Sequence, residues 1–162
     1  MGIVNSARLA SGIAAFAFGA TVAFAQAPVR PPYGTAISLE TAKKIAAGAV
    51  AESKKQSWNV AVAIVDNHGL LVYYEMQDNT QTASAHIAVE KARTSATLRR
   101  PTKELEQNIA DGRIAVLALG GLPVEGGLPI VVDGKMIGAI GVSGMASPQD
   151  AQVARAGLDA LK

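Results

Sequence analysis

Apolar runs joined by very short turns constrain the fold of this chain more than any other feature. Residues 66–69 (DNHG) separate two β-rich runs in NVAVAIVDNHGLLVYYEM, and residues 133–134 (DG) separate LPIVV from MIGAIGVSG. Such short connections join antiparallel strands, whereas a parallel pair needs a crossover of a dozen or more residues. The sequence therefore predicts a largely antiparallel sheet.

Other segments have the apolar periodicity of helices. Ser38 is a natural N-cap for a helix that ends near Gln56, and the segment 82–98 repeats apolar residues at helical spacing without Gly or Pro. A short helix over 102–110 follows. A last helix over 147–161 has a serine and a proline at its start, which favours helix initiation there.

The run IAVLAL at 114–119 is predicted as a further strand, because it precedes the turn-forming residues GGLP. With this run the sheet has about five strands, and the order of elements is α-β-β-α-(α)-β-β-β-α. Helices that flank such a sheet indicate an α+β fold rather than a doubly wound one. The glycines at 138, 141 and 144 match no nucleotide-binding loop and predict close backbone approach instead.

The first 25 residues have the pattern of a secretory signal peptide. Residues 9–25 carry no charge, follow Arg8 and end in Ala-Phe-Ala. We predict cleavage after Ala25 and export to a periplasm or to the extracellular space; an uncleaved membrane anchor is the alternative. After cleavage, we expect an extended lead-in over 26–37, a single domain over 38–162, and no stable membrane insertion.

Charge and cysteine content exclude several classes of function. The chain has no cysteine, which removes disulfides, iron–sulfur clusters and thiolate metal sites. Its formal net charge is +2 and no basic run is longer than a pair, so we expect no nucleic-acid partner. A metal or cofactor would have to be held by His, carboxylate, hydroxyl or backbone groups.

Candidate ligand residues gather on the predicted helix 82–98. His86 and Glu90 are four residues apart and share a helix face, and Thr94 continues the same series. Together His86 and Glu90 suit a metal, and His86 alone suits a haem iron; a solvated His–Glu pair is the alternative. Arg93 is a candidate partner for propionates or another small carboxylate. Neighbouring residues with the same potential are Lys91, Arg99 and Arg100. The other histidine, at position 68, is accounted for by its turn.

Several segments together resemble one known family. They are SLETAKKIAAGAVAES, VAIVDNHGLLV, AVEKARTSATLRRPT, LGGLPV, GLPIVVDGKMIGAIGVSGM and QDAQVARAGLDAL. On these segments the chain from Ile37 to Lys162 is identified as a member of the GlcG/HbpS family, also described as haem-degrading domains and related to the C-terminal part of PduO-type proteins. The resemblance implies a curved antiparallel sheet flanked by helices, homo-oligomers, and haem binding in some members.

The resemblance also implies a site on helix 82–98. In a secreted member, the threonine of the motif corresponding to KARTSAT is implicated in contacting haem iron, and by position it resembles Thr94. Glutamates just upstream are tied to iron binding there; here His86 stands at the first position, Val89 at the second, and Glu90 one residue further on. Imidazole is a better haem ligand than carboxylate. We therefore expect His86 and Thr94 to bind the iron, and Glu90 and Arg93 to contact the haem.

Taken together, these features predict an exported, homo-oligomeric haem-binding protein that handles or senses haem iron. We expect a binding protein rather than an enzyme, with slow oxidative haem degradation at the same site as one alternative. A second alternative is an accessory module that binds a small carboxylate. It is suggested by the resemblance to proteins of glycolate-use operons and by the arginine-rich end of helix 82–98.

Overall fold

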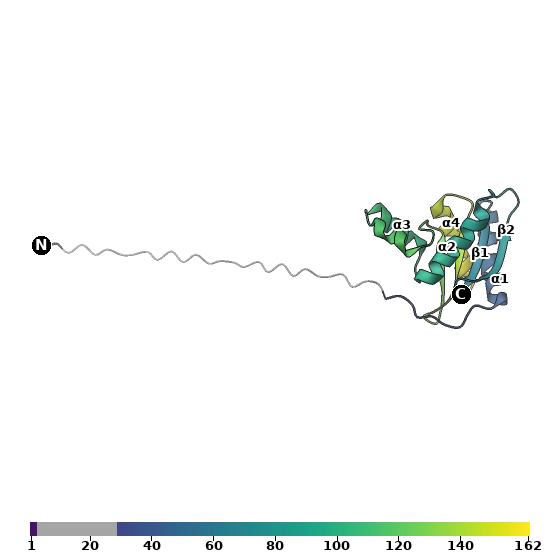
Figure 1. The fold of residues 1–162 in the computed structure, drawn as a ribbon, viewed down its shortest axis with the longest axis horizontal. Coiled ribbons are helices and arrows are strands. Elements are labelled where there is room, and N and C mark those ends of the chain that lie inside the picture. Colours follow the sequence, from purple (N-terminus) through teal and green to yellow (C-terminus); the bar gives the residue numbers. More distant parts are fainter. Residues whose placement is uncertain (3–28) are drawn as a thin grey trace.

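The computed structural model describes residues 1–2 and 29–162 (Figure 1). The predicted cleavage site and almost all of the predicted signal peptide lie outside the described residues. In chain order the elements are α1 (Leu39–Lys55), β1 (Ala61–Asp66), β2 (Leu71–Met76), α2 (Ser84–Leu98), α3 (Thr102–Ala110), the 3-10 helix η1 (Ile114–Leu119), β3 (Gly127–Val132), β4 (Lys135–Ser143) and α4 (Ser147–Asp159). In this described part of the chain, each helix is too short or too polar to cross a membrane.

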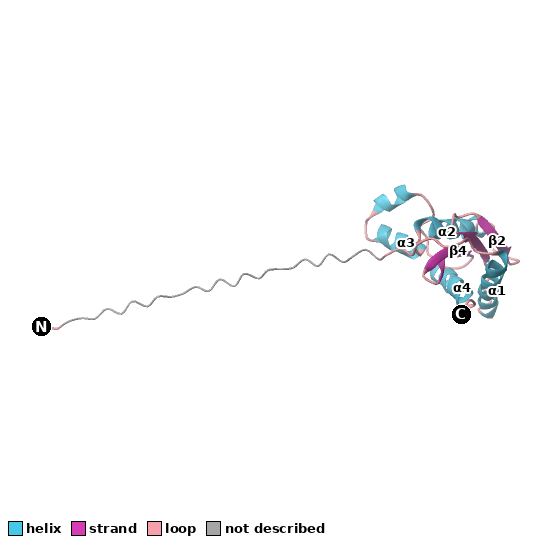
Figure 2. Ribbon diagram, turned by 90° about the horizontal axis from the view of Figure 1, so that it is seen from below, coloured by secondary structure: helices cyan, strands magenta, loops and turns pink. Residues whose placement is uncertain are grey.

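The strands form one antiparallel sheet in the order β2-β1-β4-β3. Helix α2 covers one face of this sheet, and α1 and α4 cover the other, so the body of the molecule has three layers (Figure 2). The green segment that holds α3 lies to one side, beyond the sheet (Figure 1). The predicted α+β fold, with an antiparallel sheet and flanking helices, is confirmed.

Strand β1 is buried on both faces, and the two faces differ in side-chain size. Val62 and Ile64 belong to the apolar cluster beneath α1 and α4, whereas Ala61 and Ala63 belong to the cluster beneath α2. Because successive side chains of a strand point to opposite faces, Val62 and Ile64 lie on one side, and Ala61, Ala63 and Val65 lie on the other. The layer between α2 and the sheet is therefore built mainly from alanines, with Val65 and Met136 as its larger buried members.

Helix α2 meets strand β4 at the level of the backbone. A Cβ atom at Gly141 would lie 2.0 Å from the carbonyl oxygen of Ala88 and 2.5 Å from the amide nitrogen of Ala92. Glycine is therefore required at position 141 for the helix to rest on the strand. The prediction that the glycines of this strand permit close backbone approach is confirmed at this position.

The strand predicted at 114–119 is wrong, because these residues form η1, and the sheet of the described residues has four strands. A short apolar run does not distinguish a strand from a helix, and Ala and Leu favour the helix. The turn that ends α3 also leads directly into η1, since the N–H of Arg113 donates to the carbonyl oxygen of Asn108. The run therefore continues a helical path instead of reaching the sheet.

The predicted helices are present, with small shifts at their ends. Ser38 is confirmed as the N-cap of α1, since its Oγ accepts a hydrogen bond from the N–H of Thr41. Helix α2 begins at Ser84, slightly later than predicted. Helix α4 has Ala146 as its N-cap residue and ends at Asp159.

The described part of the lead-in, residues 29–37, contains no helix and is attached to the sheet. The N–H of Gly34 donates to the carbonyl oxygen of Met136 at 2.8 Å, and the N–H of Met136 donates to the carbonyl oxygen of Pro32 at 2.8 Å. Tyr33 thus pairs with the start of β4 through a parallel bridge. The lead-in therefore belongs to the folded body from about residue 32 onwards.

We expect Gly141→Ala to destabilise the protein by about 3 kcal/mol or more. The new Cβ would overlap backbone atoms of α2, which cannot move aside as the end of a flexible side chain can. The free energy of unfolding, measured by urea denaturation, checks this expectation. Gly112→Ala is the control, since a Cβ there meets nothing within 4 Å and adds only the cost of a left-handed φ. A loss at position 141 no larger than at position 112 would contradict the proposed contact.

Candidate functional site

The residues of α2 that face solvent form one stripe. His86, Arg93 and Thr97 are exposed, and Glu90 is partly exposed beside them. Their spacings are close to whole turns of an α-helix, which has 3.6 residues per turn. We call these four residues the α2 outer face. The structure thus brings the predicted site residues His86, Glu90 and Arg93 to one surface.

Thr94 does not lie on the α2 outer face. Its side chain is 2% exposed, and its Oγ1 accepts a hydrogen bond from the N–H of Leu122 at 2.8 Å. Each step of four residues turns a helix by about 400°, so two steps from His86 rotate Thr94 by about 80° away from it. The expectation that residues 86, 90 and 94 share one exposed stripe is therefore wrong for Thr94.

Arg93 is held in place by two contacts. Its guanidinium group forms an ion pair with Glu90, and its Nε donates to the carbonyl oxygen of Gly69 at 3.3 Å. The second contact ties the middle of α2 to the turn between β1 and β2. A guanidinium group has five N–H donors, so donors remain for a further anion. The α2 outer face therefore combines an imidazole, a carboxylate and a guanidinium group.

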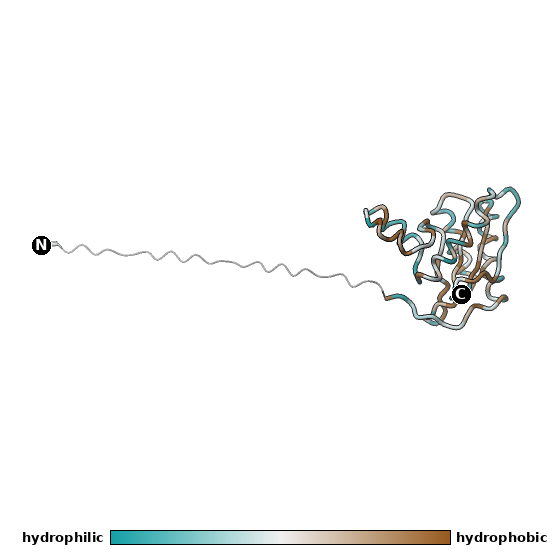
Figure 3. The backbone as a smooth tube through the Cα atoms, viewed as in Figure 1, coloured by the Kyte–Doolittle hydropathy of each residue, from teal (hydrophilic) through white to brown (hydrophobic). Residues whose placement is uncertain are grey.

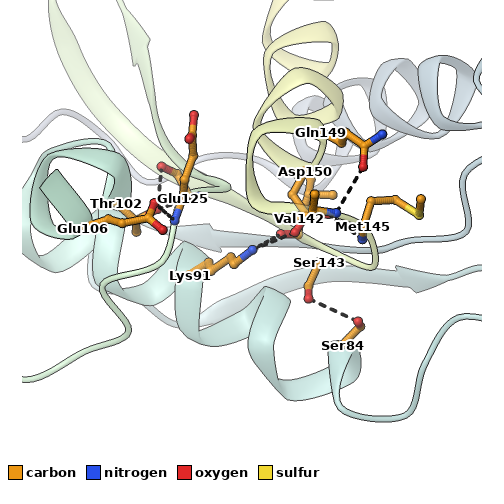
Figure 4. Close-up of polar contacts among 12 residues, drawn as sticks. Ser84, Lys91, Thr102, Glu106, Glu125, Val142, Ser143, Met145, Gln149 and Asp150 are labelled. Atoms are coloured by element: carbon orange, nitrogen blue, oxygen red, sulfur yellow. Dashed lines mark hydrogen bonds and ion pairs between the residues drawn. The ribbon is translucent and has the colours of Figure 1, made fainter. Parts of the chain in front are cut away.

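Lys91, a predicted partner for a carboxylate ligand, is used internally. Its Nζ lies 2.8 Å from Oδ2 of Asp150 and 3.1 Å from the carbonyl oxygen of Val142, and both side chains of the ion pair are 2% exposed (Figure 4). Asp150 also accepts a hydrogen bond from the N–H of Met145. The pair joins α2 to the end of β4 and the start of α4, so the prediction of a ligand contact by Lys91 is wrong.

The two arginines after α2 also have partners within the fold. The guanidinium carbon of Arg99 lies 5.1 Å from the ring centroid of Tyr33, a distance at which cation and ring attract each other. Arg100 is partly buried, and its Nε donates to the carbonyl oxygen of Leu98 at 3.2 Å. Both side chains therefore contribute to the packing of the end of α2.

A groove that was not predicted from the sequence lies beside the end of α2. It has a volume of about 330 Å³ and is lined by Tyr33, Asn67, His68 and Thr97. His68 is exposed, whereas Asn67 is buried and donates through Nδ2 to the carbonyl oxygen of Gly34 at 2.6 Å. In the sequence the turn alone accounts for residue 68, and no local pattern brings Tyr33 to that turn. The lining residues meet only through the tertiary fold.

The 3-10 helix η1 presents apolar side chains to solvent. Ile114, Leu117 and Leu119 are 68%, 57% and 55% exposed. Figure 3 shows brown, hydrophobic residues in the lobe that projects beside the sheet. Exposed apolar patches often mark surfaces that contact ligands or partners. The sequence does not reveal this surface, because the apolar run at 114–119 predicts a strand of the sheet.

We expect Lys91→Met to destabilise the protein by about 3–5 kcal/mol, because it leaves the buried Asp150 carboxylate without its cation. Adding Asp150→Asn to that variant removes the charge, keeps an acceptor for the N–H of Met145, and should recover part of the loss. Urea unfolding of the two variants and the wild type checks both expectations. An unchanged stability in Lys91→Met would show that the buried ion pair is not formed.

The stability of the single variant Lys91→Met should depend on pH in a defined direction. Burial raises the pKa of Asp150 above its ordinary value of 3.8, while the hydrogen bond and charge of Lys91 act to lower it. Without Lys91 the pKa rises further, so the folded variant keeps a proton that the unfolded chain has released. The free energy of unfolding of Lys91→Met should therefore fall as the pH increases from about 4 towards neutrality.

The chain is similar in sequence to two curated proteins from enteric bacteria. It is 42% identical over 108 residues to Protein GlcG of Escherichia coli, and this alignment covers 66% of the chain and 81% of GlcG. It is 27% identical over 149 residues to the corrinoid adenosyltransferase PduO of Salmonella typhimurium, which covers 83% of the chain and 43% of PduO.

Three crystal structures are similar in fold. HbpS has a TM-score of 0.74 and 31% identity, over 86% of this chain and 99% of that chain. A double mutant of Streptomyces reticuli HbpS has a TM-score of 0.73 and 33% identity, over 85% of this chain and 99% of that chain. The complex of PduOC with haem has a TM-score of 0.71 and 26% identity, over 78% of this chain and 95% of that chain.

The match to a protein family covers most of the chain. The model of the family described as haem degrading protein HbpS-like matches residues 37–159. These residues include every helix and strand from α1 to α4, and therefore also the α2 outer face and η1. The chain belongs to the HbpS-like family of haem degrading proteins.

Proposed function

We propose that this protein binds haem on the α2 outer face, with His86 as the iron ligand. The observation that carries the proposal is the exposed imidazole of His86, one helical turn before the ion pair of Glu90 and Arg93. Membership of the HbpS-like family supports it, as does the similarity to a structure that contains haem. Imidazole is a common protein ligand of haem iron.

The chemistry of these side chains fits haem. An imidazole nitrogen binds iron, and a guanidinium group binds carboxylates through paired hydrogen bonds. Arg93 follows His86 by about two turns, or about 10 Å along the helix axis. His86 would therefore hold the iron, and Arg93 would hold a propionate of the same haem. Glu90 holds Arg93 on this face, and the unused N–H donors of Arg93 remain free for the propionate.

A porphyrin ring also needs apolar contacts. The loop that follows η1 reaches α2 at Thr94, about 12 Å beyond His86 along the helix axis. The exposed side chains of η1, with Leu117 at the centre of the run, are suited to cover part of the ring. In this proposal η1 supplies apolar cover while α2 supplies the polar groups.

Bound haem would supply a redox-active iron, and the residues of this chain would bind and orient it. Slow oxidative haem degradation at the same residues is the second candidate, and the family description favours it. The two candidates differ in one measurable property. A degrading protein consumes haem in the presence of a reductant or a peroxide, whereas a carrier retains it unchanged.

A haemin titration followed by the Soret band tests the proposed site. We expect a saturable Soret shift for the wild type, and a loss of at least about tenfold in affinity for His86→Ala, because the iron loses its imidazole ligand. His68→Ala is the matched control, since it removes the other exposed imidazole and should bind haem like the wild type.

Two results would contradict the proposal. If the wild type and His86→Ala bind haem with equal affinity, a residue other than His86 binds the iron. If the wild type shows no Soret shift, it does not bind haem. A rise in its melting temperature with glycolate would then favour the small-carboxylate module, because a ligand that binds the native state stabilises that state. We would place that carboxylate in the groove lined by His68 and by Tyr33, the ring on which Arg99 stacks.

We further propose that the protein is exported after cleavage behind Ala25, that it forms homo-oligomers, and that it handles or senses haem iron outside the cytoplasm. The uncharged run over 9–25 supports export. The exposed side chains of Val131 and Val132, at the end of the edge strand β3, support self-assembly, because they would lose contact with water in an interface.

Export should be visible in the mass of the protein. When the full chain is expressed in a bacterial host, we expect the periplasmic or secreted form to begin at Gln26, as measured by intact mass spectrometry. A form that retains residues 1–25 in the membrane fraction would favour the uncleaved anchor instead. Light scattering of the purified form gives its oligomeric state, and a monomer would reject self-assembly.

A further inference from the structure

The hydroxyl group of Thr94 is engaged by a loop of the same chain. Its Oγ1 accepts the hydrogen bond from the N–H of Leu122 at 2.8 Å, and the side chain is 2% exposed. An iron atom could reach this oxygen only if the loop moved away. The position of Thr94 on α2 therefore suits contact with the loop better than contact with an external ligand.

Gly121 brings the backbone of this loop directly onto Thr94. Gly121 has a φ of +91°, and a Cβ atom there would lie 2.6 Å from Oγ1 and 2.9 Å from Cγ2 of Thr94. A side chain at position 121 would be strained by the backbone conformation and would also collide with Thr94. The loop and the threonine thus form a close contact in addition to the hydrogen bond.

Other hydrogen bonds around η1 are either local to the segment or lead to α3. The N–H of Arg113 donates to the carbonyl oxygen of Asn108, and the N–H of Glu125 donates to Oε2 of Glu106 at 3.0 Å. Over residues 113–124, as the structure describes them, the hydrogen bond to Thr94 is the one that reaches α2. Thr94 therefore sets where this segment lies relative to α2.

We propose that Thr94 is a positioning residue of the haem site. By holding residues 120–122 against α2, it fixes the apolar surface of η1 relative to His86 and Arg93. This inference rests on the proposed haem binding, and it gives Thr94 a role different from the iron ligation that the family resemblance implies. The residue acts through the loop and does not touch the iron.

Three variants separate positioning from ligation. Thr94→Val has nearly the same shape but lacks the acceptor oxygen, whereas Thr94→Ser keeps the oxygen. Gly121→Ala disturbs the same contact from the loop side and adds no group that can bind iron. Thermal unfolding of each variant first establishes that it is folded at the temperature of the assay.

The first measurement is hydrogen exchange of the haem-free protein over residues 114–122. Exchange should be roughly tenfold or more faster in Thr94→Val and Gly121→Ala than in the wild type, because the loop loses its contact with α2. Thr94→Ser should exchange like the wild type. Exchange in Thr94→Val equal to that of the wild type would overturn the proposal, whatever the protein binds.

The second measurement is the rate at which bound haem is released to an excess of a haem-scavenging protein. Release should be several-fold faster in Thr94→Val and Gly121→Ala, while the Soret maximum of each haem complex stays at the wild-type position. The double variant should release haem little faster than either single variant, because both substitutions break one contact. A shifted Soret maximum in Thr94→Val but not in Gly121→Ala would instead show ligation by Thr94.

The two measurements also separate this proposal from the one on which it rests. A wild type that binds no haem overturns the haem function and, with it, the role of Thr94 in a haem site. The exchange measurement then still decides whether Thr94 holds the loop. A wild type that binds haem, together with release rates that Thr94→Val leaves unchanged, overturns the positioning role alone.

Discussion

The direct contact between α2 and strand β4 is the constraint on which the rest of the structure depends. With glycine at position 141, the backbone of α2 near Ala88 and Ala92 rests on the sheet, and this fixes the rotation of the helix about its axis. That rotation directs Lys91 towards Asp150 in the interior and His86 towards solvent. Because position 141 has no side chain, the helix lies close to the strand, and this determines which residues of α2 are buried and which are exposed.

The same contact decides where a ligand of the size of haem can lie. The layer between α2 and the sheet is filled by backbone atoms and mainly by alanines, together with Val65 and Met136, and protein interiors pack as densely as organic crystals. The opposite layer is filled by larger side chains such as Ile64 and Ile140. Neither layer leaves room for a flat macrocycle in the core, so the proposed site lies on the outer surface of α2 and against η1.

Features with local causes could be predicted from the sequence, namely the hairpin turns, the cap at Ser38 and the helical stripe of α2. Features that depend on distant residues could not. The partner of Lys91 lies 59 residues along the chain, so its burial has no local signal. Thr94 does not share the exposed face of His86, because each step of four residues adds a small rotation and the rotations add up along the helix. The run 114–119 is not a strand, because apolar character alone does not reveal whether a strand partner is present.

The residues of the proposed haem site lie on the exposed side of α2, so in this proposal ligand binding and core packing depend on different residues of one helix. Substitutions at exposed positions such as His86 and Arg93 usually change the free energy of unfolding by less than about 0.5 kcal/mol. Lys91 and Thr94, on the inner sides of the same helix, instead make buried contacts with Asp150 and with the N–H of Leu122. A scaffold of this kind can acquire a different iron ligand, or a different ligand altogether, through a few surface substitutions while its architecture stays the same.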